Sequence, residues 1–265
     1  MSGEYARHVR LAHPNVVRVL AGTRLNIPAD AENPHTLTSC PTMLMDWLPD
    51  PTPLGVYLVK SRPIHSTLVG LILQCLHGLS YIHDQGIVHW DLKADNLLVD
   101  KHGLLRITDL GNSVSRDSVP SEVRTSLWNL PEELRRLRSQ NPNTPNTARR
   151  VTLDLQEGTK WHSPQIDLYM LGRELDRFLS PRAESPGAAD LAVPDYDRSS
   201  ALRFLQSAFP GSEAAAQFTL AFLRLVVSRL LAAAHEEGGP YYQTAQDVIA
   251  ELENCTGLPL DAADA

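Results

Sequence analysis

The chain has 265 residues and a mass of 29.3 kDa, with 43% hydrophobic residues and a formal net charge of −7. This composition suits one large globular domain or two small ones, and it excludes collagen-like and wholly disordered chains. Because the charge balance leaves no basic excess to attract phosphates, nucleic acid is not an expected partner. The three cysteines lie far apart without a Cys-x-x-Cys pair, so neither a disulfide framework nor a zinc ribbon is indicated.

Two stretches of the chain bear on its location. Residues 1–15 contain charges and histidines where a secretory signal peptide would need an apolar run. The most apolar long stretch, residues 218–234, carries Arg224 and Arg229 and would span only about 25 Å as a helix. We therefore expect a cytoplasmic protein with no membrane partner, in which this stretch forms a core helix.

The first fifty residues predict a helix and a hairpin. Apolar periodicity favours a helix over residues 4–12, which ends at His13-Pro14 because the residue before proline avoids the helical conformation. Residues 16–20 and 42–47 read as two short strands, and residues 23–40 between them read as a loop.

The strongest helical pattern covers residues 66–85, where seven apolar residues share one face and Gly86 is the expected stop. Two short strands are expected at 97–99 and 104–108, joined by a turn. Downstream, polar loops are expected at 139–148 and 180–200, and helices at 165–179, 199–207, 213–235 and 243–254.

Between that helix and the two short strands lies the run His89-Trp90-Asp91-Leu92-Lys93-Ala94-Asp95-Asn96, and Asp109-Leu110-Gly111 begins eighteen residues after Asp91. This pair of motifs resembles the catalytic loop and the Asp-Phe-Gly turn of the protein kinase superfamily. The order of helix, loop, strand, turn and strand is also the context that the motifs require. His77 and His83 on the preceding helix are expected to be packing or surface residues, not metal ligands.

The resemblance implies a chemical role for each motif residue. Asp91 would accept the proton of the substrate hydroxyl, and Lys93 would stabilise charge on the transferred phosphate. Asn96 and Asp109 would hold Mg²⁺ between the phosphates of ATP, since a hard cation prefers oxygen ligands. The implied cofactors are therefore ATP and Mg²⁺.

More of the family pattern can be placed on this chain by resemblance. Glu4 stands where kinases have the glutamate of their N-lobe helix, nine positions before His13. The adenine pocket would comprise the gatekeeper, the hinge and the pocket floor, at Met45, Asp46, Leu48 and Leu98. Thr125 begins a run to Glu132 that resembles the end of the activation segment and would lie at the substrate site.

The resemblance continues to residue 254. Asp167 begins a run similar to the helix that anchors the catalytic loop from below. Ending the activation segment at residues 125–132 makes 133–163 an insertion, which is expected to be solvated loop because its proline and asparagine content can bury little surface. A rival alignment uses residues 158–165 for the segment end, but it leaves no connection before Asp167.

The resemblance implies an α+β protein-kinase-like fold with a mainly helical C-lobe and a partial N-lobe of one helix and about two strands. The partial N-lobe and hinge would cover residues 1–48, the C-lobe 49–254 and a tail 255–265. The Asp-Leu-Lys-x-x-Asn form of the loop, with threonine at 125, resembles the Ser/Thr class, so the implied substrate is a protein hydroxyl.

The chain departs from the family pattern at its start. It has no Gly-rich loop, and its four lysines, Lys60, Lys93, Lys101 and Lys160, all follow Glu4, so none can be the strand lysine that pairs with that glutamate. Three explanations stay open: a sequence truncated at its N-terminus, a remnant kept as a protein-interaction scaffold, or a partner that completes the N-lobe. Each predicts an exposed strand edge and an exposed apolar helix face here.

Two smaller departures concern regulation. Trp90 replaces an arginine that in many kinases pairs with a phosphorylated activation loop, and tryptophan cannot make that charge-assisted bond. Activation by loop phosphorylation is therefore not expected. Gln243 stands near the place where the family has the arginine that pairs with the glutamate matching Glu132.

Overall fold

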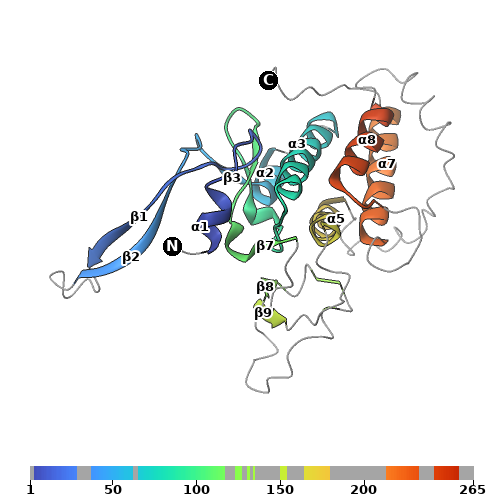
Figure 1. Ribbon diagram of the computed structural model, residues 1–265. Coiled ribbons are helices and arrows are strands. Elements are labelled where there is room, and N and C mark those ends of the chain that lie inside the picture. Colours follow the sequence, from blue (N-terminus) through green and yellow to red (C-terminus); the bar gives the residue numbers. More distant parts are fainter. Residues whose placement is uncertain are drawn as a thin grey trace.

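The computed structural model describes most of the chain in ten ranges. These are residues 3–28, 37–61, 65–116, 123–126, 130–131, 134, 150–153, 164–179, 213–232 and 242–256. Short strands dominate the first part and long helices the second (Figure 1), so the expected α+β class is confirmed. No helix within these ranges has the length and apolar character needed to cross a membrane.

A long hairpin extends from the molecule as an arm (Figure 1). Strand β1 (Val19–Pro28) pairs antiparallel with β2 (Leu37–Met45), with a register shift around Leu20. The predicted loop over residues 23–40 is therefore wrong at both ends. Most side chains of β1 after Val19 are exposed, so this stretch lacks the apolar alternation by which a half-buried strand is recognised.

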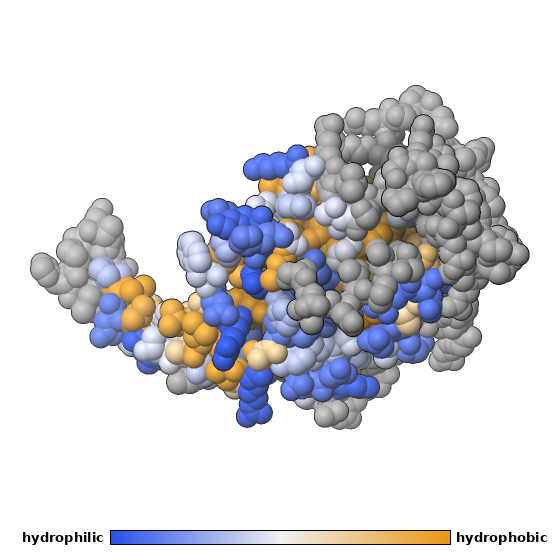
Figure 2. Space-filling view, turned by 90° about the horizontal axis from the view of Figure 1, so that it is seen from above, coloured by the Kyte–Doolittle hydropathy of each residue, from blue (hydrophilic) through white to orange (hydrophobic). Residues whose placement is uncertain are grey.

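One face of this arm is apolar and open to solvent. The pairing register puts Leu25, Ile27 and Leu44 on the same face, where they are 50%, 46% and 57% exposed. Apolar surface is visible along the arm in Figure 2. Among the described strands, β1 and β2 pair only with each other, so the exposed edge predicted from the sequence is confirmed.

Helix α1 (Gly3–His8) lies beside the base of the arm. The ring of Tyr5 packs so closely on Gly22 that a Cβ atom there would lie 2.5 Å from it. Tyr5 is half-buried and His8 is fully buried. Because the hairpin covers Tyr5, the exposed apolar face expected for the predicted helix is limited to Ala6 in α1 and to Val9, which lies just beyond it and is 37% exposed.

Helix α3 (His65–Asp84) runs through the centre of the molecule and matches the predicted range within one residue. Its buried side chains join the main core, and it contacts α8 (Ala245–Thr256), β6 (Leu105–Ile107) and β4 (Ile87–Val88). Gly86 follows with φ of 71°, a left-handed conformation that suits glycine after a helix.

Two small sheets lie around the loop that follows α3. Strand β5 (Leu97–Val99) lies between β3 (Thr52–Pro53) and β6, and β4 pairs with β7 (Val114–Ser115). Val16 adds a parallel bridge to Ile107, the last residue of β6. These pairings bring residues 89–96 and the turn at Asp109 to the same part of the molecule.

The remaining helices form the larger, helical part. Helix α5 (Gln165–Leu179) has the predicted range, and its Gly172 lies so close to α7 (Glu213–Ala232) that a Cβ atom would be 2.8 Å from Leu230. Helix α2 (Leu54–Ser61) was not predicted. The predicted helix 199–207 and the loops 139–148 and 180–200 lie outside the described residues.

A strand pair joins residues 123–126 to the stretch that was expected to be an insertion. Strand β8 (Val123–Ser126) pairs antiparallel with β9 (Arg150–Leu153), and β9 falls inside the stretch that the sequence predicts to be an inserted loop. The loop prediction is therefore wrong for residues 150–153. Their pairing with β8 satisfies backbone groups of both segments.

Candidate active site

A cluster of three polar residues lies in the loop between β4 and β5. Lys93 Nζ contacts Asp91 Oδ2 at 2.6 Å, and Asn96 Nδ2 donates to the Asp91 carbonyl oxygen at 2.9 Å. Asp91 is 1% exposed and Lys93 is 19% exposed, so the lysine side chain lies nearer to solvent than the buried carboxylate that it contacts. Asn96 belongs to the short helix η1 (Ala94–Asn96). The structure therefore brings together Asp91, Lys93 and Asn96.

Asp167 of α5 holds this loop from below. Its Oδ2 accepts from the His89 amide at 2.8 Å and from His83 Nε2 at 2.8 Å, and its Oδ1 accepts from the Trp90 amide at 2.9 Å. Burial alone would raise the pKa of Asp167, but the hydrogen bond and nearby charge of His83, aided by His89, lower it below its usual range. The carboxylate is therefore charged, and both of its oxygens accept hydrogen bonds.

Two further contacts that support the loop, one through Asp167 and one directly, were not predicted from the sequence. His83, expected to be a packing or surface residue, is buried and bonded to Asp167. Glu174 of α5 is also buried, and its Oε2 accepts from the Ala94 amide at 3.2 Å. Their only sequence signal is a polar residue within a mainly buried helix, which does not identify a partner about 80 residues away.

Trp90 occupies a strained position in this loop. Its φ is 64°, its side chain is fully buried, and its Nε1 atom has no hydrogen-bond partner in the described part of the chain. A left-handed conformation costs about 1–2 kcal/mol for a residue other than glycine. The bonds that the His89 and Trp90 amides donate to Asp167 offset this cost and fix the loop geometry.

Asp109 reaches the same site from β6. The Thr108 amide donates to the Asn96 carbonyl at 3.0 Å, and His89 Nε2 donates to the Thr108 carbonyl at 3.0 Å. Asp109 adopts a left-handed φ of 63°, and its Oδ1 accepts from the Gly111 amide at 3.3 Å. Both backbone polar groups of Thr108, the residue before Asp109, are therefore bonded to the loop at residues 89–96.

Helix α1 contacts the turn that follows Asp109. Arg7 Nε donates to Ser113 Oγ at 2.8 Å, and His8 Nε2 donates to the Val17 carbonyl at 2.7 Å. Burial lowers the pKa of His8, partly offset by that bond, and His89 and Asp109 exert smaller opposing effects. The helix is therefore held against η2 (Leu110–Asn112) and the base of β1.

The predicted adenine-pocket residues lie on the chain between β2 and β5. Met45 ends β2 and is half-buried, Leu48 is buried, and Leu98 is half-buried in β5. The Asp46 amide donates to the Arg18 carbonyl at 2.9 Å, so this predicted hinge amide serves to join the two segments. The Leu48 side chain is 8% exposed, whereas the neighbouring Trp47 is 86% exposed.

Two predicted residues are described only by their backbone. Glu4 lies in α1, and Thr125 lies in β8 opposite Val151 of β9. The side chains of Glu4 and Thr125, like the whole of Glu132, fall outside the described residues. Gln243, by contrast, accepts from Gln165 Nε2 at 2.5 Å at the start of α5.

The oxygen groups at this site suit a hard divalent cation. Because Asn96 Nδ2 donates to the Asp91 carbonyl, the amide oxygen of Asn96 is directed away from that carbonyl. Asp109 adds a half-buried carboxylate from the adjoining turn. Magnesium ions commonly take one or two such protein ligands and complete their shell with phosphate and water oxygens. Asn96 and Asp109 therefore fit Mg²⁺ bound together with a nucleotide.

Several curated proteins are similar to part of this chain. The Emericella nidulans cytokinesis protein sepH is 45% identical over 69 residues, and the Schizosaccharomyces pombe MAP kinase kinase kinase mkh1 is 50% identical over 67. Each match covers 25% of this chain, and 5% and 6% of the relative. A probable serine/threonine-protein kinase of S. pombe, C70.05c, is 35% identical over 116 residues, 42% of this chain and 14% of that protein.

A solved structure and a family model complete the comparisons. The yeast RNA Pol II CTD kinase CTDK-1 complex contains a chain that matches 68% of this one, over 50% of its own length, with 23% identity and a TM-score of 0.45. The model of the protein kinase domain matches residues 2–147, just over half of the chain, and these residues contain the loop at Asp91 and the turn at Asp109. The chain belongs to the protein kinase domain family.

Proposed function

We propose that this chain is the catalytic part of a Ser/Thr-type protein kinase, which transfers the γ-phosphate of ATP to a protein hydroxyl. One observation carries the proposal. Asp91, Lys93 and Asn96 converge in a loop that a buried Asp167 fixes from below, and Thr108 ties Asp109 to that loop. In phosphoryl transfer the protein contributes mainly positioning and charge neutralisation, which such a fixed arrangement supplies.

Each residue has a defined task in this proposal. The Asp91 carboxylate accepts the proton of the attacking hydroxyl, and Lys93, which contacts it at 2.6 Å, offers positive charge to the phosphoryl group. Asn96 and Asp109 hold Mg²⁺, which neutralises phosphate charge when bound. Leu98 would pack against adenine, and the backbone at Met45, Asp46 and Leu48 would bind its polar edge, apart from the Asp46 amide, which is bonded to the Arg18 carbonyl.

The substrate class rests on the loop sequence and on the relatives. Asp91-Leu92-Lys93, followed by Asn96, resembles the Ser/Thr class, and relatives that match part of this chain carry the names of serine/threonine and MAP kinase kinase kinases. We assign the protein substrate to the surface near Thr125 of β8. A cytoplasmic location and domain limits at residues 48 and 254 belong to the same proposal.

The phosphates of ATP need a further cation in this proposal. No lysine of the sequence precedes Glu4, and Lys93 already contacts Asp91. We propose that a partner, or a segment outside this sequence, completes the N-lobe and supplies that charge. The open edges of the β1–β2 hairpin support this because they can accept additional strands.

The test is ATP-dependent phosphorylation of a generic protein substrate by this chain, alone and with its natural flanking sequence. We expect Asp109→Ala to reduce the rate by at least about a hundredfold, because one metal ligand is lost. Asp84→Ala, at an exposed aspartate ending α3, is the matched control and should retain the rate. Unchanged phosphorylation by the Asp109→Ala variant would refute the assignment.

The apolar face of the hairpin supports a second candidate, a catalytically impaired scaffold that binds a protein partner. Leu25, Ile27 and Leu44 lie on one face of the hairpin and are about half exposed, and exposed apolar surface of this kind often marks a protein-binding site. Calorimetry with Mg²⁺ and ATP separates the two candidates. Binding by the folded chain supports the kinase, whereas a folded chain that binds neither supports the scaffold.

A further inference from the structure

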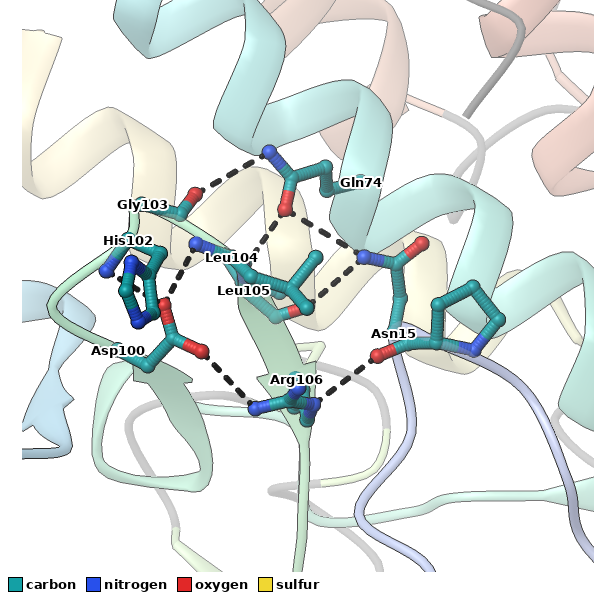
Figure 3. A network of polar contacts seen from close by, with 9 residues as sticks. Asn15, Gln74, Asp100, His102, Gly103, Leu104, Leu105 and Arg106 are labelled. Atoms are coloured by element: carbon teal, nitrogen blue, oxygen red, sulfur yellow. Dashed lines mark hydrogen bonds and ion pairs between the residues drawn. The ribbon is translucent and has the colours of Figure 1, made fainter. Parts of the chain in front are cut away.

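One polar side chain of α3 makes all its described contacts with segments far away in sequence. Gln74 is half-buried between the buried Leu73 and Cys75, on the side of α3 that faces β6. Its Oε1 accepts from the Leu105 amide at 2.7 Å and from Asn15 Nδ2 at 3.4 Å, and its Nε2 donates to the Gly103 carbonyl at 3.3 Å (Figure 3).

Leu105 needs these contacts because its backbone is buried and turned away from β5. Its amide is bonded to Gln74 and its carbonyl accepts from Asn15 Nδ2 at 2.9 Å. The Leu105 side chain is fully buried. Without the two amide side chains, the first residue of β6 would leave a buried donor and a buried acceptor unpaired, which proteins avoid.

The rest of β6 depends on the same segment. The Ile107 amide donates to the Asn15 carbonyl at 2.8 Å, and the Val17 amide donates to the Ile107 carbonyl at 2.9 Å. Arg106 Nε also donates to the Pro14 carbonyl at 3.2 Å. Strand β6 is therefore held by β5 on one edge and by residues 14–17 on the other. Gln74 anchors its first residue, Leu105.

The turn before β6 is stabilised mostly from within. Asp100 Oδ1 accepts from the amides of His102 and Leu104, and Asp100 Oδ2 accepts from Arg106 at 3.1 Å (Figure 3). These bonds shape the turn, while the Lys101 amide joins it to the Pro49 carbonyl at 3.1 Å. The described hydrogen bonds that join this turn to α3 are those of Gly103 and Leu105 with Gln74.

The position of β6 decides the position of a metal ligand. Asp109 follows Ile107 by two residues, and Thr108 between them is bonded to the catalytic loop. A strand rises about 3.3 Å per residue, so even a partial slip of β6 moves Asp109 by a distance that matters for catalysis.

We propose that Gln74 is a positioning residue for the metal site: through Leu105 and Gly103 it fixes β6, and β6 sets the position of Asp109 relative to Asn96. This inference rests on the proposed kinase function. Gln74 touches neither nucleotide nor substrate in this scheme, and it acts only through the strand.

The test uses the full chain and two readouts, affinity for ADP with and without Mg²⁺ by calorimetry, and hydrogen exchange at the Leu105 amide. Gln74→Met keeps the side-chain length but removes the acceptor and the donor. We expect it to weaken ADP binding in Mg²⁺ by about three- to tenfold, with less than a twofold change in EDTA, and to speed Leu105 exchange. Gln74→Glu retains the acceptor for Leu105 and should recover most of the Mg²⁺ effect. Gln85→Met, at an exposed glutamine beyond α3, is the matched control.

The outcomes separate the inference from the proposed function. An equal loss of affinity with and without Mg²⁺, or no loss in Gln74→Met, would overturn the positioning role while the kinase proposal stands. If the unsubstituted folded chain shows no Mg²⁺-dependent ADP binding, the kinase proposal fails and this inference fails with it. A selective loss in Mg²⁺ that Gln74→Glu recovers supports both.

Discussion

At the scale of single residues, buried polar groups fix the site. Asp167 accepts three described bonds, from His83 and from two successive backbone amides. Hydrogen bonds to a charged group contribute about 1.5–3 kcal/mol each. The catalytic loop therefore does not depend on its own sequence alone, and even the left-handed Trp90 is tolerated within it.

His8 makes the stability of the chain depend on pH. Burial lowers its pKa, and His89 and Asp109 act on it as the nearby titratable groups. The unfolded chain therefore takes up a proton near the usual pKa of about 6.5, while the folded chain resists it. Stability is fully present above about pH 6.5 and falls as the pH drops through the lowered pKa. His8→Gln keeps an N–H for Val17 but removes this titration.

The measurement is urea unfolding of the parent chain and the His8→Gln variant at pH 7.5 and pH 5.5. The parent should lose more free energy of unfolding between the two pH values, by up to about 1.4 kcal/mol per pH unit. Equal losses in the two proteins would show that His8 is not responsible.

Sequence reasoning identified the residues of the loop and Asp167 as its anchor, and it missed the other residues that support the loop. Asp91, Lys93 and Asn96 were predicted because they fall within eight consecutive positions, and the structure brings these three together. Gln74 and Glu174 were not predicted. Each bonds to backbone amides 31 or 80 residues away, and a backbone partner leaves no trace in the identity of the residue that carries it.

At the scale of elements, α3 carries two glycines in opposite surroundings. A Cβ atom at Gly78 would lie 2.8 Å from the Asn15 carbonyl oxygen and 2.9 Å from Ile107 Cδ1, whereas one at Gly70 meets nothing within 4 Å. Both substitutions by alanine favour the helix by about 0.5–1 kcal/mol. Only Gly78→Ala forces α3 away from the segment that holds β6.

We therefore expect Gly70→Ala to raise the free energy of unfolding by about 0.5–1 kcal/mol, and Gly78→Ala to lower it by about 1–3 kcal/mol. Gly70→Ala is the control for the helix-propensity gain that both variants share. Chemical denaturation of the two variants beside the parent measures the difference. A Gly78→Ala protein as stable as Gly70→Ala would mean that the close approach of α3 to Asn15 can relax freely.

The long helix α5, which has one buried face, was predicted well, and strand β1, which lacks one after Val19, was not. The range of α5 was predicted to the residue, because its apolar side chains face α7 at helical spacing. The length of β1 was underestimated, since Thr23, Arg24 and Asn26 are exposed and give no alternation. Their strand conformation depends on pairing with β2. A pattern search over one short segment does not detect such pairing, because it involves two segments of the chain.

At the scale of the whole molecule, the projecting hairpin predicts self-association. An exposed apolar strand pair favours association, because another chain can pair with its open edge or pack on its apolar face. We expect the double variant Leu25→Thr/Leu44→Thr to sediment as monomer at concentrations where the parent associates, with a change in free energy of unfolding of about 0.5 kcal/mol or less.

The control is Val56→Thr on α2, which removes a 41% exposed apolar side chain outside the hairpin. Sedimentation velocity over a concentration series measures the association of the three proteins. If the Leu25→Thr/Leu44→Thr chain associates as strongly as the parent, the hairpin face is not the adhesive surface.

The bond between Asp167 and the His89 amide also has a consequence for chain length. It joins residues 78 positions apart and so closes a large loop of chain. The entropy of closing such a loop grows only with the logarithm of its length, so a doubling costs about 0.6 kcal/mol. That is less than one hydrogen bond to the charged Asp167 contributes. Loop closure alone therefore tolerates insertions and deletions between β7 and α5 outside β8, β9 and the buried Leu130 and Leu134, and the loop at residues 89–96 keeps its anchor on Asp167.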